Sequence, residues 1–195
     1  SVILAGVLLK LGAYGFLRFS IALLPFASEY FGPFVFVLCA VNIVYASLTA
    51  LRMVDLKKMI AYSSIAHIGF VIIGLFSLNV QGIEGALLLI LSHGIVASGL
   101  FLCVGVLYDR THTRLILYYG GLVQTIPLFS LFFLVLIIGN ISVPGTSSFV
   151  GESIVLFGML QTNTPIAAVS AGSMVLGTAY SLWLYNRVSL GSVKS

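Results

Sequence analysis

Four ionisable side chains stand inside long apolar stretches of this sequence, where they could carry protons. Lys10 lies near the middle of the first stretch, His67 and His93 lie in two later ones, and Glu152 follows a Pro-Gly pair. Placing a charged side chain at the centre of a membrane-spanning helix costs about 2.5–3.5 kcal/mol, so such residues are rare and mark functional sites. An imidazole also gains and loses a proton near neutral pH. The four residues therefore predict proton transfer at membrane depth.

The composition predicts that these stretches cross a membrane. Hydrophobic residues make up 60% of the 195 residues, charged residues make up 7%, and the mean hydropathy is +1.18. A soluble chain carries about 25% charged residues. The apolar runs are continuous, which favours helices over the alternating pattern of barrel strands. We therefore predict an all-α integral membrane protein.

Six stretches are long enough to span a bilayer, because a spanning helix needs about 20 apolar residues. They are Val2–Leu24, Pro33–Leu51, Met59–Leu78, Gly85–Leu107, Thr125–Leu160 and Pro165–Tyr185. The fifth is too long for one straight span and contains Pro144 and Gly145. We predict that Asn140–Ser148 separates two half-helices, as in transporters whose broken helices form ion sites. The expected architecture is a polytopic helical bundle of about six spans with one discontinuous helix.

The charges between the stretches predict one orientation. The cations gather in three places, namely the loops 52–58 and 109–114 and the tail with Arg187 and Lys194. The intervening loops contain Glu29 and Glu84 and no cation. Two spans separate each cationic segment from the next, so all three should lie on one side of the membrane. The positive-inside rule makes that side the cytoplasm or the mitochondrial matrix.

Other common chemistries are not indicated. The net charge of +4 is too small to suggest a nucleic-acid partner, and no Gly-rich phosphate loop follows a strand. Cys39 and Cys103 stand alone in apolar runs, which is typical of packing residues rather than of a disulfide or metal site. No Cys or His cluster could hold an iron–sulfur centre or a haem. His112, in a cationic loop, is interpreted as a solvated residue.

Several motifs connect the ionisable residues to a known family. They are Ser1–Gly12, Asp55–His67, Leu91–Gly94, Gly105–Arg110, Leu117–Val123 and Asn140–Glu152. Through these motifs the sequence resembles the chain-4 family of antiporter-like membrane subunits of respiratory complex I, NADH–ubiquinone oxidoreductase. The resemblance covers essentially the whole chain. The motifs Leu8–Gly12 and Pro144–Phe149 also separate it from the sibling subunits 2 and 5.

The resemblance implies a fold and a set of site residues. Residues 1–195 would form a single membrane domain that corresponds to spans eight to thirteen of a family fold with about fourteen spans in two inverted repeats. The family's central lysine would be Lys10, its relay histidines His67 and His93, and its broken-helix acid Glu152. The carboxylate and lysine of the first repeat have no counterpart here. We expect them on another polypeptide, or on the rest of a protein of which this is a part.

The resemblance also implies a function. The chain would be a proton-translocating membrane-arm subunit that couples NADH:ubiquinone electron transfer to proton pumping, with no redox centre or metal of its own. NAD, FMN, iron–sulfur clusters and ubiquinone are expected elsewhere in the complex, and chains 2 and 5 are the expected neighbours. The expected location is the mitochondrial inner membrane, or else a bacterial inner membrane. The alternative is a subunit of a related cation/proton antiporter complex. A purely structural scaffold would not need four buried ionisable groups.

Overall fold

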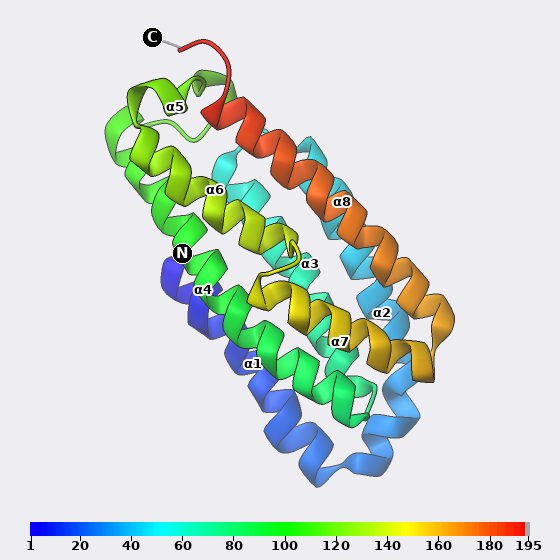
Figure 1. Ribbon diagram of the computed structural model, residues 1–195. Helices are drawn as coiled ribbons and strands as arrows, with labels where there is room; N and C mark the ends of the chain where they lie inside the picture. The colour runs from blue at the N-terminus through cyan, green and yellow to red at the C-terminus, as the bar shows by residue number, and fades with distance from the viewer. Residues whose placement is uncertain (194–195) are drawn as a thin grey trace.

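The computed structural model describes residues 1–193, and nearly all of them are helical (Figure 1). The order of elements is η1 Leu4–Leu8, α1 Leu9–Gly15, η2 Phe16–Ile21, α2 Pro25–Arg52, α3 Leu56–Phe76, α4 Val80–Thr111, η3 Ile116–Tyr118, α5 Leu122–Thr125, α6 Pro127–Ile141, α7 Ser147–Thr162 and α8 Thr164–Ser189. The described residues contain one isolated bridge, between Asp55 and Leu115, and no strand. The prediction of an all-α membrane bundle is confirmed.

The first predicted span is one continuous helical rod with two irregular sections. The short α-helix α1 lies between η1 and η2, which are π-helical. Wider π-helical turns inside a helix are rare and occur frequently at functional sites. Lys10 belongs to α1, directly after the first of these sections.

Several helices are longer than the sequence predicts, and α2 differs most. The predicted span Pro33–Leu51 begins too late, because α2 starts at Pro25 and includes Pro33 in its interior. Pro25 occupies the first turn, where a missing N–H group costs no helical hydrogen bond. The helices α4 and α8 also extend beyond the apolar stretches that predicted them, whereas α3 begins earlier, at Leu56, but ends at Phe76, before the predicted Leu78. Apolarity marks the part of a helix inside the hydrocarbon, whereas the helical hydrogen bonds continue into the polar boundary of the membrane.

The fifth predicted span is broken, as expected, but over a shorter segment. The helix α6 ends at Ile141, and α7 begins at Ser147, so the non-helical segment is 142–146 rather than 140–148. Ser142 and Gly145 have positive φ angles of 60° and 102°. The Thr146 hydroxyl caps α7 by accepting a hydrogen bond from the Phe149 N–H at 3.3 Å.

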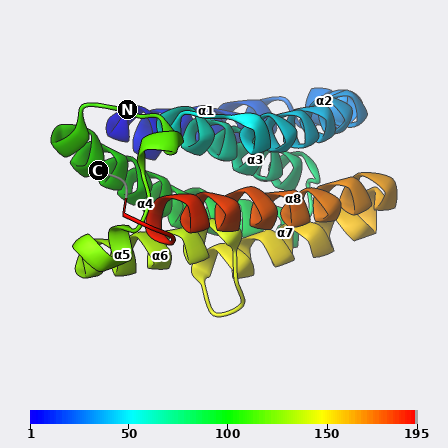
Figure 2. The same cartoon turned by 90° about the horizontal axis from the view of Figure 1, so that it is seen from above.

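The helices form two layers joined by α4. Seen from above, α1, α2 and α3 lie in one layer, and α6, α7 and α8 lie in the other (Figure 2). The long helix α4 contacts α3, α6 and α7. Glycines allow α4 and α7 to approach closely, since a Cβ atom on Gly158 would lie 2.9 Å from the Gly82 nitrogen and one on Gly85 would lie 2.8 Å from the Val155 nitrogen.

The cationic segments meet at one end of the bundle. Leu56 N–H donates to the Arg114 carbonyl at 3.0 Å, and Ile116 N–H donates to the Val54 carbonyl at 2.9 Å. Gly121 N–H donates to the carbonyl of Leu190 at 3.2 Å. The prediction that these segments share one side is confirmed. Lys194, which was counted with the cationic tail, lies outside the described residues.

Length and apolarity fit a membrane protein throughout this part of the chain. Five helices are long and apolar enough to cross a bilayer, and α6 is a shorter apolar helix. In the broken span, α6 approaches the break from the cationic end, and α7 continues from it to the opposite end, where the Asn79 amide donates to the Gly158 carbonyl at 3.1 Å. The break therefore lies in the middle of the bundle.

Candidate functional site

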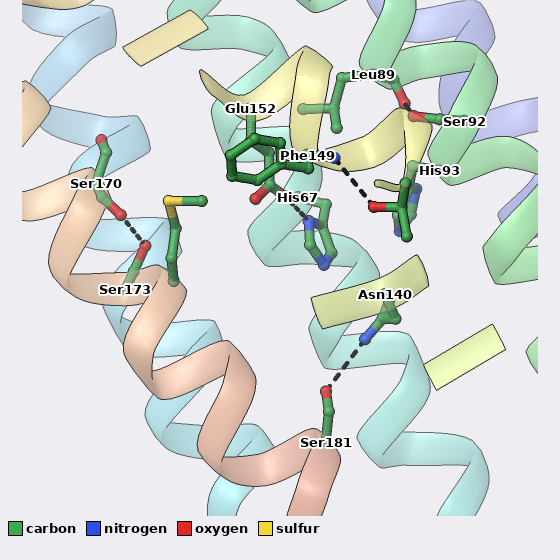
Figure 3. Close-up of polar contacts among 12 residues, drawn as sticks. His67, Leu89, Ser92, His93, Asn140, Phe149, Glu152, Ser170, Ser173 and Ser181 are labelled. Carbon is green, nitrogen blue, oxygen red and sulfur yellow. Dashed lines mark hydrogen bonds and ion pairs between the residues drawn. The ribbon is translucent and has the colours of Figure 1, made fainter. Parts of the chain in front are cut away.

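The four ionisable residues form one continuous row at the centre of the bundle. Lys10 Nζ lies 3.2 Å from His93 Nδ1, and the ring centroids of His93 and His67 are 4.9 Å apart. His67 Nδ1 then lies 2.8 Å from Glu152 Oε1. Figure 3 shows the contact between His67 of α3 and Glu152 of α7. The structure brings all four predicted residues together, in the order Lys10, His93, His67, Glu152.

Close packing of the first span on α4 determines the position of the Lys10 side chain at one end of the row. A Cβ atom on Gly94 would lie 3.3 Å from the Gly6 carbonyl oxygen and 3.7 Å from Lys10 Cε. Because Gly94 has no side chain, the lysine stem passes over α4 and its amine reaches the neighbouring His93. The same amine donates a hydrogen bond to the Ala5 carbonyl.

The break between α6 and α7 determines the position of Glu152 at the other end of the row. Glu152 lies in the second turn of α7, and this residue is 1% exposed. His67 is the ionisable partner in contact with it, and His67 is 12% exposed at its side chain. Removing one partner from a buried, hydrogen-bonded pair leaves the other uncompensated, which is costly. His67 and Glu152 are therefore best treated as one unit.

Both imidazoles keep a ring nitrogen free within the bundle. His67 Nε2 and His93 Nε2 are buried and have no hydrogen-bond partner among the described residues. His93 is 4% exposed and the His67 side chain is 12% exposed, so both rings lie inside the bundle. Each ring therefore uses Nδ1 toward one end of the row and leaves Nε2 available for the other ring or for a bridging water.

A small cavity lies beside the His67–Glu152 pair. Its lining includes His67, Glu152, Asn140, Ser173 and Tyr180, and it has room for about one water molecule. Asn140 and Tyr180 also line a second small cavity. Glu152 therefore lines a small cavity with both polar and apolar walls, beside the break between α6 and α7.

The second cavity continues toward the cationic end of the bundle. Ser63 and Ser181 line it together with Met59 and Leu184. Asn140 Nδ2 donates to Ser181 Oγ at 3.3 Å, and Asn140 Oδ1 is buried without a partner (Figure 3). Polar groups therefore extend from Glu152 toward the cationic end of the bundle, as far as the apolar side chains of Met59 and Leu184.

Sequence reasoning did not single out the uncharged members of the site. Tyr180 is 2% exposed and lines both small cavities, the first together with Glu152 and the second together with Ser63. Serines are common in membrane helices, where their hydroxyls bond to carbonyls of the preceding turn, as Ser63 does to Ile60 at 2.8 Å. Nothing in the sequence separates these residues from structural ones. The one available signal was Asn140, which lies next to the break.

A metal site is not indicated in the described part of the chain. These residues contain no group of three or more His, Cys, Asp or Glu side chains that could hold an ion. Cys39 and Cys103 are both free thiols there. The row itself offers one amine, two imidazoles and one carboxyl group.

The fold agrees with the comparisons to known proteins. Residues 1–177 match the transmembrane family described as NADH:quinone oxidoreductase/Mrp antiporter, and the chain belongs to this family. It is 61% identical over 194 residues to NADH-ubiquinone oxidoreductase chain 4 of Marchantia polymorpha, covering 100% of this chain and 39% of that protein. It is 52% identical to NADH-quinone oxidoreductase subunit M of Rhodobacter capsulatus, covering 99% and 38%. The chain thus spans about two fifths of the length of these relatives.

Two solved structures are also similar. One is respiratory complex I from Thermus thermophilus with bound NADH, with a TM-score of 0.92 and 32% identity over 95% of this chain and 40% of the matched chain. The other is the Mrp complex from Dietzia sp. DQ12-45-1b, with a TM-score of 0.81 and 22% identity over 86% of this chain and 32% of that one. The second likeness shows the shared fold alone.

Proposed function

We propose that this chain is the proton-translocating part of a membrane-arm subunit of respiratory complex I, in which Lys10, His93, His67 and Glu152 relay protons. The observation that carries the proposal is the unbroken row of contacts, at 3.2 Å, 4.9 Å between ring centroids and 2.8 Å. Residues 1–195 would form one membrane domain equivalent to spans eight to thirteen of the family. The identity to chain 4 proteins supports complex I over the antiporter complexes.

The contacts define complementary donors and acceptors along the row. A protonated Lys10 donates to the lone pair of His93 Nδ1, so the single N–H proton of that neutral ring lies on Nε2. An ionised Glu152 accepts from His67 Nδ1–H, so His67 Nε2 carries a lone pair. No direct hydrogen bond joins the two rings. At this step His93 Nε2–H is the donor and His67 Nε2 is the acceptor.

One proton crosses the row in three transfers. Lys10 gives its proton to His93 Nδ1, and the imidazolium that forms releases its Nε2 proton to His67 Nε2, directly or through one water. His67 then releases its Nδ1 proton to Glu152. Both rings end in the other tautomer and must return before the next proton follows. Each transfer leaves the number of protons unchanged, so no redox step is needed in this chain.

The proposed setting follows from the family. The chain is a multi-pass protein of the mitochondrial inner membrane, as its similarity to chain 4 of plants and algae indicates. Its partners would be other complex I subunits, with chains 2 and 5 as the neighbours. NAD, FMN, iron–sulfur clusters and ubiquinone would be bound by other subunits, and this chain would bind no cofactor. An apolar groove beside Lys10, lined by the first span and α4, would be covered by the preceding part of the full-length protein, or by a separate polypeptide that carries that part.

Two measurements on the complete protein in its membrane assembly test this proposal. Native electrophoresis with an NADH-oxidation stain should find the protein in a large NADH-oxidising complex; a smaller assembly without that activity would indicate the antiporter alternative. Proton uptake per NADH oxidised should then fall in Glu152→Gln and remain normal in Glu29→Gln, a matched change at an exposed residue. Normal pumping by an assembled Glu152→Gln complex would refute the relay.

A further inference from the structure

A groove at the cationic end of the bundle lies outside the relay. The end of α2 and its following loop form one wall with Arg52 and Val54, and α8 forms the other with Trp183 and Arg187. Ile116 of η3, which is 3% exposed, also lines the groove. The groove has a volume of about 310 Å³, so it is large enough for a phosphate group with its glycerol attachment.

The two arginines of this groove have no acidic partner in the described chain. Asp55, the nearest acid in sequence to Arg52, pairs with Lys58 at 3.5 Å. The Arg187 guanidinium lies over the Trp183 ring, 5.3 Å from its centroid, and this contact leaves the positive charge in place. The groove therefore presents two uncompensated cations, both exposed, above an apolar floor.

The position of the groove along the helices is that of lipid headgroups. Arg52 is the last residue of α2, and Arg187 lies in the last turn of α8. Tyr45 and Leu48 share a helix face with Arg52 by their spacing, and they are 67% and 50% exposed. Trp183 is 37% exposed one turn below Arg187, where amphipathic aromatic rings mark the membrane boundary. The two arginines thus lie at the membrane boundary, and exposed apolar surface lies next to them on the membrane side.

We propose that this groove binds an anionic phospholipid, whose phosphate lies between Arg52 and Arg187 and whose acyl chains follow the apolar surface of α2 and α8. Arginine binds phosphate oxygens through two parallel hydrogen bonds, and basic pockets between membrane helices on this side of a bilayer bind anionic headgroups. The charge of the groove selects an anion, and the exposed apolar residues below it select a lipid over free phosphate.

Photo-labelling of the complete protein in its membrane assembly tests this proposal. The assembly is placed in phosphatidylcholine nanodiscs that contain either a photoactivatable phosphatidylglycerol or a phosphatidylcholine with the same photoactivatable chain. Peptide mapping then locates the label. Phosphatidylglycerol should label the segments 45–54 and 175–187 more strongly than phosphatidylcholine does.

The variant Arg52→Gln/Arg187→Gln should lose this preference, with apparent affinity falling about fivefold per arginine removed. The matched control is Arg110→Gln/Arg114→Gln, which removes two charges at the same end of the bundle and should retain the labelling. If both variants lost the preference for phosphatidylglycerol equally, the preference would come from the overall surface charge, and the proposed site would be wrong. Equal labelling by both lipids, displacement by inorganic phosphate, or cross-links from the groove to a protein neighbour would overturn it as well.

Discussion

The two ends of the ionisable row differ in how completely this chain encloses them. Glu152 is 1% exposed and lies among α3, α7 and α8, which all line its cavity. Lys10 is only half-buried, on a span of which 11% is buried, against 72% of α3. A groove of about 550 Å³ opens beside Lys10. The Glu152 end is therefore enclosed by the described chain, whereas the Lys10 end is open on one side.

This difference suggests separate roles for the two ends. An enclosed carboxyl group can exchange protons only through the groups and waters of its own cavity, so substituting it should be hard to compensate. An amine at an open boundary depends on whatever covers it, so its behaviour should vary with the state of assembly. The following variants, made in the complete protein within its complex, test that contrast.

Glu152→Gln should have the largest effect. The amide keeps the shape of the side chain but removes its ability to take up and release a proton, and acid–base groups typically contribute 10²–10⁴-fold to the steps they serve. We expect proton pumping per NADH oxidised to fall about tenfold or more, while the complex still assembles. Glu152→Asp should retain part of the activity. Pumping assays in sealed vesicles, with Glu29→Gln as the control, measure this directly.

Lys10→Ala should have the next largest effect, because it removes the first donor of the row. We expect pumping to fall by about tenfold, with assembly unchanged. Lys10→Arg should not restore it, because a guanidinium stays protonated and cannot pass its proton on. The exposed Lys58→Ala is the matched control. Restored pumping in Lys10→Arg would mean that Lys10 acts through its charge alone.

His67→Ala and His93→Ala should each have a partial effect. Removing one ring leaves space that water can enter, and water can both donate and accept a proton. We expect a loss of a few-fold in pumping, about 1 kcal/mol at the transfer step. His67→Ala should be the more severe of the two, since it also removes the partner of the enclosed Glu152. His112→Asn, at an exposed loop position, provides the control, and a larger loss in His93→Ala would contradict the contrast between the two ends.

Tyr180→Phe should have the smallest effect. The change removes only the hydroxyl group that lines both small cavities beside Glu152. We expect pumping to fall about twofold and the solvent deuterium isotope effect to change, which loss of packing alone would not produce. Tyr119→Phe is the control, because its hydroxyl is bonded to Thr111 and the Thr113 carbonyl at the cationic end. Equal isotope effects in the two variants would remove Tyr180 from the site.

The features that could be predicted were those that depend on the chemical type of a single residue or of a pair adjacent in sequence. Lys10, His67, His93 and Glu152 were recognisable because a bilayer penalises ionisable groups, and Pro144-Gly145 marked the break because it is incompatible with a straight helix. The ends of the helices were less predictable. Apolarity stops at the hydrocarbon boundary, while the hydrogen bonds of α2 continue to Pro25.

The sequence by itself determined the membrane class, the order of the spans, the shared side of the cationic segments and the depth of each ionisable residue. It did so because hydropathy and helical rise together locate each residue along the membrane normal. Only the tertiary structure decided that Lys10 contacts His93 and that His67 contacts Glu152, and it alone placed Tyr180 beside them. Neighbours within the membrane plane depend on which helix faces pack together, and close approaches such as that of Gly82 and Gly158 set those faces through contacts between distant parts of the chain.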